Sequence, residues 1–151
     1  MFEIKEQYKI SDLLEIMKIL RSENGCPWDR EQTHRSIRSN VIEEAYEVAE
    51  AIDMNSDEML CEELGDLLLQ VVFHARMAEE EKSFSFDDVV DGICKKLVHR
   101  HPHVFGEVVV ENSNQVLDNW AEIKKKEKKQ SSASEVMGSV AKSLPALMRA
   151  E

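Results

Sequence analysis

The sequence predicts an all-α protein, and its composition and residue pattern are the two observations that predict it. Only five glycines and three prolines interrupt 151 residues, and the β-branched alternation that is typical of strands is scarce. The apolar residues instead recur at the three- and four-residue spacing of one helical face. At this length the chain most simply forms one domain with a substantial hydrophobic core.

Five helices are expected in order along the chain. Ser11 or Asp12 is suited to cap the first, Asn55-Ser56-Asp57 supplies a turn and a cap before the third, and Ser85 caps the fourth. Residues 24–29 are predicted to form an ordered loop, and the His101-Pro102-His103 segment ends the fourth helix. The expected helices cover residues 9–21, 33–54, 57–81, 85–98 and 114–129.

The segment after the fifth helix differs in composition. A basic run over residues 124–129 leads into a serine-rich linker, and residues 136–148 form an amphipathic stretch. We therefore expect a domain over residues 1–130 and, over 131–151, a linker and tail. The tail could dock on a partner subunit or begin a further domain.

Two copies of one acidic pattern stand 19 residues apart. Glu43-Glu44-Ala45-Tyr46-Glu47 is followed by Glu62-Glu63-Leu64-Gly65-Asp66, and the flanking apolar positions repeat with the acids. Each copy lies on a predicted helix, beside the stripe that the helix would bury. If the two helices pack as a hairpin with its turn near Asn55, Glu44 faces Asp66 and Glu47 faces Glu63.

These four carboxylates are suited to bind a divalent metal ion. A lone glutamate on a helix is ordinarily solvated, but residues 60–75 are apolar nearly all round, which predicts a buried helix. Like charges about 5 Å apart repel by roughly 3 kcal/mol per pair at an effective dielectric near 20. Bound cations or raised pKa values must offset this repulsion. Oxygen ligands alone favour Mg²⁺ or Mn²⁺, whereas Glu43 and Glu62 point further towards solvent.

Magnesium held by few carboxylates keeps open positions, and its usual partner is a substrate phosphate. The chemistry suggested is attack of an activated water on a phosphoanhydride, with Glu47 or a neighbouring carboxylate as base and Glu43 placing a water. Phosphate oxygens also need cations, and the candidates are Lys96, Arg100 and Lys124, each of which could equally be a surface charge. Trp28 and Trp120 could stack on a base or belong to the core.

Charge and cysteine content limit the other function classes. The formal net charge of −11 argues against a nucleic-acid partner. Three cysteines without close ligand spacing favour a reduced, cytoplasmic protein, and no apolar run is long enough to span a bilayer. A di-iron bundle is disfavoured, because neither acidic motif has a histidine three residues from a glutamate.

The acidic motifs and their flanking loops closely resemble the MazG family of nucleoside triphosphate pyrophosphohydrolases. The resemblance covers about residues 9 to 128. It includes the run from Gly25 to His34 before the acids and the run from Arg100 to Gly106 after them. Residues 143–150 resemble the segment that leads into a second domain in tandem family members.

The resemblance implies a dimer-forming, four-helix-type bundle that hydrolyses nucleoside triphosphates between the α- and β-phosphates. It implies Glu44, Glu47, Glu63 and Asp66 as Mg²⁺ ligands, and as nucleotide contacts Lys96, Arg100, Trp120 and Lys124. Housecleaning of non-canonical nucleotides would be the purpose. Two alternatives stay open: a dedicated dUTP or phosphoribosyl-ATP pyrophosphohydrolase, and a non-catalytic dimerisation or regulatory domain. The sequence does not distinguish a dimer from a tetramer.

Overall fold

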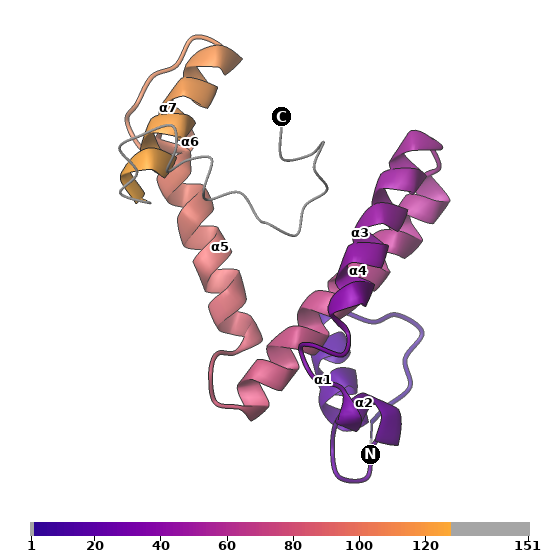
Figure 1. Cartoon of the computed structure of the whole chain (residues 1–151). Coiled ribbons are helices and arrows are strands. Elements are labelled where there is room, and N and C mark those ends of the chain that lie inside the picture. The colour runs from indigo at the N-terminus through magenta and orange to yellow at the C-terminus, as the bar shows by residue number, and fades with distance from the viewer. Residues whose placement is uncertain (1, 128–151) are drawn as a thin grey trace. The chain divides into compact units, whose positions relative to one another are not determined.

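The computed structural model describes residues 2–127, and every regular element in this part of the chain is a helix (Figure 1). The all-α prediction is therefore confirmed for these residues, whereas the expected tail over 131–151 lies outside them. None of these helices is long and apolar enough to cross a membrane. The helices are α1 (Ile10–Leu20), α2 (Pro27–Glu31), α3 (Arg38–Asp53), α4 (Asp57–Glu80), α5 (Phe86–Arg100), α6 (Pro102–Phe105) and α7 (Ser113–Glu127).

Internal contacts divide the described residues into two compact units, which meet between residues 91 and 92. The boundary falls within α5. The first unit contains α1 to α4 and the start of α5, and both copies of the acidic pattern lie in it. The second unit contains the rest of α5, α6 and α7 within its described part.

The start of α1 differs from the prediction. Lys9 is the residue before the helix, and its backbone N–H donates a hydrogen bond to the carboxylate of Asp12 at 2.8 Å. Asp12 therefore caps the helix from its first turn, and neither Ser11 nor Asp12 is the N-cap residue itself. After α1 the chain turns sharply at Gly25. A Cβ atom there would lie 2.2 Å from the carbonyl oxygens of Ile19 and Leu20, so only glycine fits this close approach.

Two boundaries after α1 were also predicted wrongly. The expected loop over residues 24–29 contains the short helix α2, which has Pro27 at its first position, where the missing N–H is not needed. The next helix begins at Arg38 rather than Thr33. Thr33 and Ser36 instead close a turn: the Ser36 hydroxyl accepts the Thr33 N–H at 2.9 Å, and Thr33 Oγ1 accepts the Ser36 N–H at 3.2 Å.

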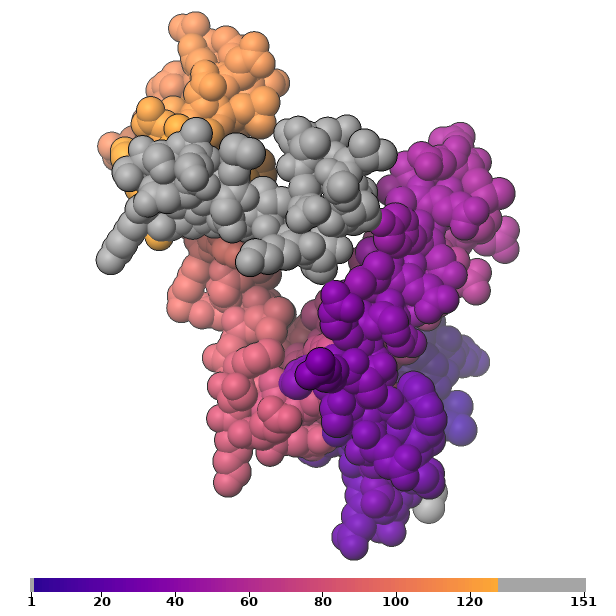
Figure 2. Space-filling view, in the orientation of Figure 1, coloured from indigo at the N-terminus to yellow at the C-terminus, as the bar shows by residue number. Residues whose placement is uncertain are grey.

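Helices α3 and α4 form a hairpin, with the two elements side by side in both views (Figures 1 and 2). The turn between them has Asn55 in the left-handed region, at a φ of 53°. Asparagine tolerates this conformation better than most residues. Ser56 then caps α4, since its side chain accepts the Met59 N–H at 3.3 Å. The predicted turn and cap are both confirmed.

The core of the first unit lies where α1 packs on the C-terminal half of α4. Its buried side chains are Met17, Ile37, Val72, Phe73 and Met77. The N-terminal half of α4 is much less covered, because Leu64 is 50% exposed and Leu68 is 40% exposed. The prediction that the whole of residues 60–75 is buried is therefore wrong for this half of the helix.

Arg21 fastens the α2 segment to this core. Its guanidinium donates to the backbone carbonyls of Asp29 and Gln32 and pairs with the Glu80 carboxylate, with Nη2 and Oε2 2.8 Å apart. The same group lies over the Phe73 ring, 5.4 Å from its centroid. Burial raises the pKa of Glu80, but hydrogen bonds from Arg21 and Arg76 outweigh it, so the net pKa is lowered.

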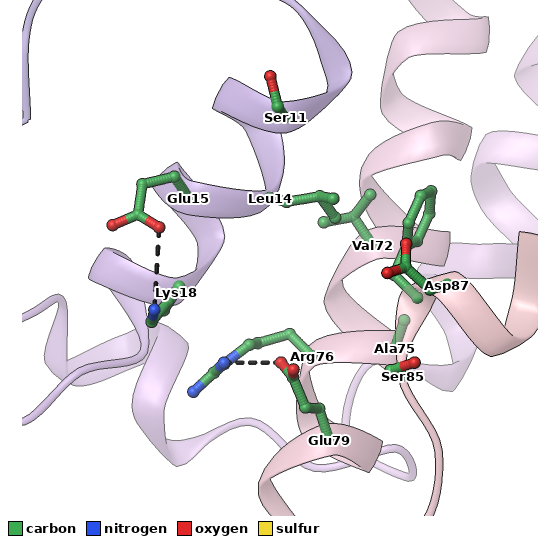
Figure 3. Close-up of a pocket in the computed structure, with 11 residues that line it drawn as sticks. Ser11, Leu14, Glu15, Lys18, Val72, Ala75, Arg76, Glu79, Ser85 and Asp87 are labelled. Carbon is green, nitrogen blue, oxygen red and sulfur yellow. Dashed lines mark hydrogen bonds and ion pairs between the residues drawn. The ribbon is translucent and has the colours of Figure 1, made fainter.

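A cavity of about 220 Å³ opens between α1, the C-terminal half of α4 and the start of α5 (Figure 3). Its two cations are already paired, Lys18 with Glu15 at 4.0 Å and Arg76 with Glu79 at 2.8 Å. None of the repeated acids lines it. This cavity therefore has no evident connection with the acidic residues of the hairpin.

Candidate metal centre

The α3–α4 hairpin brings acids of the two repeat copies together. Glu44 comes from α3, and Glu63 and Asp66 come from successive turns of α4. Each of the three offers a carboxylate oxygen, and these oxygens lie within 4.8 Å of one another. The tight turn at Asn55 causes this, since it folds the second copy of the pattern back along the first. We call these three residues the acidic cluster.

Electrostatic strain marks the acidic cluster. The pKa of Glu44 is raised, first because the carboxylate is partly desolvated and next because of the charge of Asp66 and the approach of Glu47. The pKa of Glu63 is raised by desolvation and then by the charges of Glu47, Glu62 and Asp66. The anionic form is thus disfavoured at both positions. A bound cation would relieve both effects.

Glu47 and Glu43 lie beside the acidic cluster rather than in it. Glu47 is half-buried and is a close neighbour of Glu44, and its charge is, after desolvation, the main cause of the raised pKa of Glu63. The expected pairing of Glu47 with Glu63 therefore agrees with the electrostatics, although Glu47 is outside the three-residue group. Glu43 is exposed, as is Glu62.

The donor set fits a hard divalent cation. It consists of carboxylate oxygens only, with no sulfur or imidazole, which favours Mg²⁺ or Mn²⁺ over softer metals. Oxygen ligands of one octahedral Mg²⁺ lie about 3 to 4 Å apart, because each is about 2.1 Å from the ion. The oxygens of the acidic cluster, all within 4.8 Å of one another, are close enough for small side-chain rotations to bring them onto one ion.

Gln70 is a contact of the acidic cluster that the sequence analysis missed. Its side-chain amide donates to Glu44 Oε1 over 3.4 Å, and the residue is only 8% exposed. The available signal was a single amide within the apolar run from Leu67 to Phe73. A buried amide requires hydrogen-bond partners, so an isolated glutamine in such a run indicates a specific contact.

The four predicted nucleotide contacts lie in the second unit, and the structure pairs some of them internally. The ammonium of Lys124 is 3.9 Å from the centre of the Trp120 ring, a cation–π contact. Arg100 is paired with Glu127, with Nε 3.1 Å from Oε2. Lys96 is exposed on α5, and its charge helps to lower the pKa of Glu127, for which the hydrogen bond from Arg100 is the largest cause.

Trp120 and Trp28 have different environments. Trp120 is half-buried, with the His101 ring 6.1 Å from its own, and its Nε1 is buried without a hydrogen-bond partner in the described residues. Trp28 is 57% exposed and therefore is not a core residue. His34 and His74 pair with each other in the first unit, their Nδ1 atoms 2.7 Å apart.

The fold and the acidic cluster together define a class: an all-α protein in which a helical hairpin gathers carboxylates suited to a hard cation. Residues 32–105 match the sequence model of the MazG nucleotide pyrophosphohydrolase domain. This segment, which contains the whole α3–α4 hairpin, belongs to the MazG family.

Several relatives share most of the described sequence. In an alignment of 151 positions that covers 97% of this chain, it is 50% identical to an uncharacterised protein, YabN, of Bacillus subtilis, and it spans 31% of that protein. Nucleoside triphosphate pyrophosphohydrolases of Escherichia coli and Thermotoga maritima are 49% and 47% identical over 95% and 92% of this chain. The chain spans 55% and 52% of these two proteins, about half their length.

The structure is also similar to a solved one. The crystal structure of a MazG-related protein from Thermotoga maritima superimposes with a TM-score of 0.63 at 29% identity. The match covers 77% of this chain and 99% of that protein. The likeness therefore extends over most of the described helices rather than the acidic hairpin alone.

Proposed function

We propose that this chain is a Mg²⁺-dependent nucleoside triphosphate pyrophosphohydrolase, which cleaves between the α- and β-phosphates to give the monophosphate and pyrophosphate. The observation that carries the proposal is the acidic cluster, whose three oxygens lie within 4.8 Å. Relatives at 47–49% identity are named for this activity. Removal of non-canonical nucleotides is the purpose we propose.

Glu44, Glu63 and Asp66 would hold the metal ion, with Glu47 as a further ligand. Bound Mg²⁺ would supply positive charge for the phosphate oxygens of the substrate. Glu47 is also a base candidate, because its carboxylate lies beside both Glu44 and Glu63, where it could accept a proton from a bound water. Glu43 is exposed next to it and would hold the attacking water.

The nucleotide contacts that we propose are Lys96, Arg100, Trp120 and Lys124. Lys96 and Lys124 would contact phosphate oxygens, and Trp120 would contact the base or the sugar. Arg100 would have to give up or share its contact with Glu127, because the Glu127 carboxylate and a substrate phosphate would compete for the same guanidinium. An Arg bound to a carboxylate keeps donors for phosphate, because it has five N–H groups.

We further propose that the active form is a homodimer that completes a four-helix-type bundle. The α3–α4 hairpin leaves apolar side chains uncovered, among them Tyr46, 50% exposed, and Leu64 and Leu68. Apolar side chains left uncovered on one hairpin favour burial against a partner. Light scattering of the purified chain would give its mass, and a mass of one chain would contradict the dimer.

The test of the activity is pyrophosphate release from a panel of triphosphates with Mg²⁺. We expect turnover by the wild type and a loss of about 1,000-fold in Glu63→Gln, because electrostatic stabilisation by a metal accounts for several kcal/mol of the barrier. Glu79→Gln, on the same helix but paired with Arg76, is the matched control and should stay active. Equal, negligible rates for all three proteins would refute the proposal.

The panel also separates the two alternatives. One dominant substrate, such as dUTP or phosphoribosyl-ATP, would replace the broad activity by a dedicated one. Binding of Mg²⁺ and nucleotide without turnover would indicate a regulatory domain instead.

A further inference from the structure

Gln70 is a buried polar residue of the first unit, and its burial calls for a physical reason. Counted over the whole residue it is only 8% exposed, less than any other polar or charged residue among residues 2–127. It lies on α4, one turn beyond Asp66, in the junction between the acidic half of the helix and the core half. Burying an amide costs free energy unless it gains hydrogen bonds.

One end of the amide touches the acidic cluster. Gln70 Nε2 donates to Glu44 Oε1 over 3.4 Å. A carboxylate has two oxygens and about four lone-pair positions, so this contact fixes the Glu44 side chain and leaves acceptor positions for another partner. Glu44 is repelled by Asp66 and crowded by Glu47, and without a donor it would turn away from them.

Gln70 also lines a largely apolar cavity of about 260 Å³. Its walls include Val41, Leu67 and Val71, and Gln70 Oε1 is buried with no hydrogen-bond partner in the described residues. The other polar lining residue is His74, whose ring pairs with His34 through Nδ1, so the hydrogen bond that the structure gives the Gln70 amide is the one to Glu44. The apolar neighbours restrict the conformations of the Gln70 side chain, which is how a rigid scaffold orients a ligand-bearing side chain.

We propose that Gln70 is a positioning residue for the metal site, which holds Glu44 in the conformation that binds the cation. The inference rests on the proposed function only in taking Glu44 as a ligand. It assigns no contact between Gln70 and substrate, and it concerns metal affinity before any nucleotide is bound.

The test is Mn²⁺ binding by the full chain without nucleotide. The binding is measured by calorimetry and by the loss of the electron-spin resonance signal of free Mn²⁺. Gln70→Met keeps an unbranched side chain of similar size and removes the donor. We expect its dissociation constant for Mn²⁺ to rise about tenfold, the lower end of what such supporting contacts contribute. Its stability should stay equal or rise, because an incompletely paired buried amide is lost.

The matched control is His74→Leu. His74 lines the same cavity one turn further along α4, and its hydrogen bond goes to His34 rather than to an acid. Its Mn²⁺ affinity should equal that of the wild type. Gln70→Leu, with a different shape, provides a second donor-free variant in case Gln70→Met does not fold.

The outcomes distinguish a failure of the positioning role of Gln70 from a failure of the metal site itself. Wild-type affinity in a folded Gln70 variant, together with lost affinity in Glu44→Gln, would overturn the positioning role and leave the metal site intact. Equal losses of Mn²⁺ affinity in the Gln70 variants and in His74→Leu would show that the cavity as a whole supports the site. That result would also overturn the specific role of Gln70. If the wild type itself binds no Mn²⁺, the metal site fails and the inference fails with it.

Discussion

The two halves of helix α4 have different roles: the C-terminal half packs in the core, and the N-terminal half carries the acids. From Val72 to Ala78 the inward side chains are buried, and Val72, Phe73 and Met77 belong to the core. Before Gln70 the same helix carries Glu63 and Asp66 of the acidic cluster and leaves Leu64 half exposed. Stability is therefore concentrated in one half and the proposed chemistry in the other. Substitutions in each half should have separable effects.

The largest expected effect comes from the core half. Phe73→Ala removes a ring that is 4% exposed and should lower the free energy of unfolding by about 4 kcal/mol. The measurement is chemical denaturation at low temperature, where the variant stays folded. Its Mn²⁺ affinity should match the wild type. A parallel loss of affinity in the folded variant would contradict the separation of the halves.

The next effect is at the junction of the core with α2. Arg21→Met removes the guanidinium that binds Glu80 and two backbone carbonyls and should cost about 3 kcal/mol, since its partners lose their donor. Lys18→Met, whose pair with Glu15 is exposed and 4.0 Å long, should cost under about 0.5 kcal/mol. Equal losses in the two variants would refute the special role of Arg21.

The loss in Arg21→Met should also depend on pH. The pKa of Glu80 is lowered from the ordinary 4.5 in the folded protein, so its pairing stabilises the fold above pH 4.5 and is lost as pH falls through the folded pKa. The difference between wild type and variant should therefore narrow in acid. A difference independent of pH would mean that the carbonyl contacts alone account for it.

A smaller effect is expected at the start of the acidic half. Ser56→Ala removes the cap of α4, in which Ser56 Oγ accepts the Met59 N–H at 3.3 Å, and should cost about 1 kcal/mol. Ser56→Asp, which keeps an acceptor and favours the helix dipole, should restore the stability. Failure of this rescue would show that the loss has another cause.

The smallest change should be a gain of stability in the acidic half. The pKa of Glu63 is raised above 4.5, so the folded state is favoured below pH 4.5 and loses this contribution as pH rises through the folded pKa. Glu63→Gln without metal should therefore be slightly more stable than wild type at pH 7 and equal to it near pH 4. Glu62→Gln, on an exposed neighbour, is the charge control. Saturating Mn²⁺ should reverse the order, because it stabilises the wild type by binding.

Much of the hairpin could be predicted from the sequence because its signals are local. The apolar period of α4, the turn at Asn55 and the cap at Ser56 all depend on neighbouring residues, and all three are present. The convergence of Glu44 with Asp66 followed from the helical period once the turn was placed. Glu63 joins the same cluster.

The features that the sequence did not predict depend on contacts between distant residues. Residues 60–75 are apolar enough for burial on all sides, but α1 covers only the C-terminal half of α4, so Leu64 and Leu68 stay exposed. Helix α2 was missed because Gly25 and Pro27 resemble loop residues, whereas Pro27 in fact begins the helix. The contact of Gln70 with Glu44 joins two helices 26 residues apart, which no local pattern reports.

The left-handed turn at Asn55 sets the rotation of α4 relative to α3. One residue added or removed between α3 and α4 would rotate α4 by about 100° about its axis, which turns Glu63 and Asp66 away from Glu44 while leaving every helix intact. The length of this connection is therefore as much a part of the candidate site as the acids themselves. Any redesign or comparison of such hairpins should align the turn first and the carboxylates second.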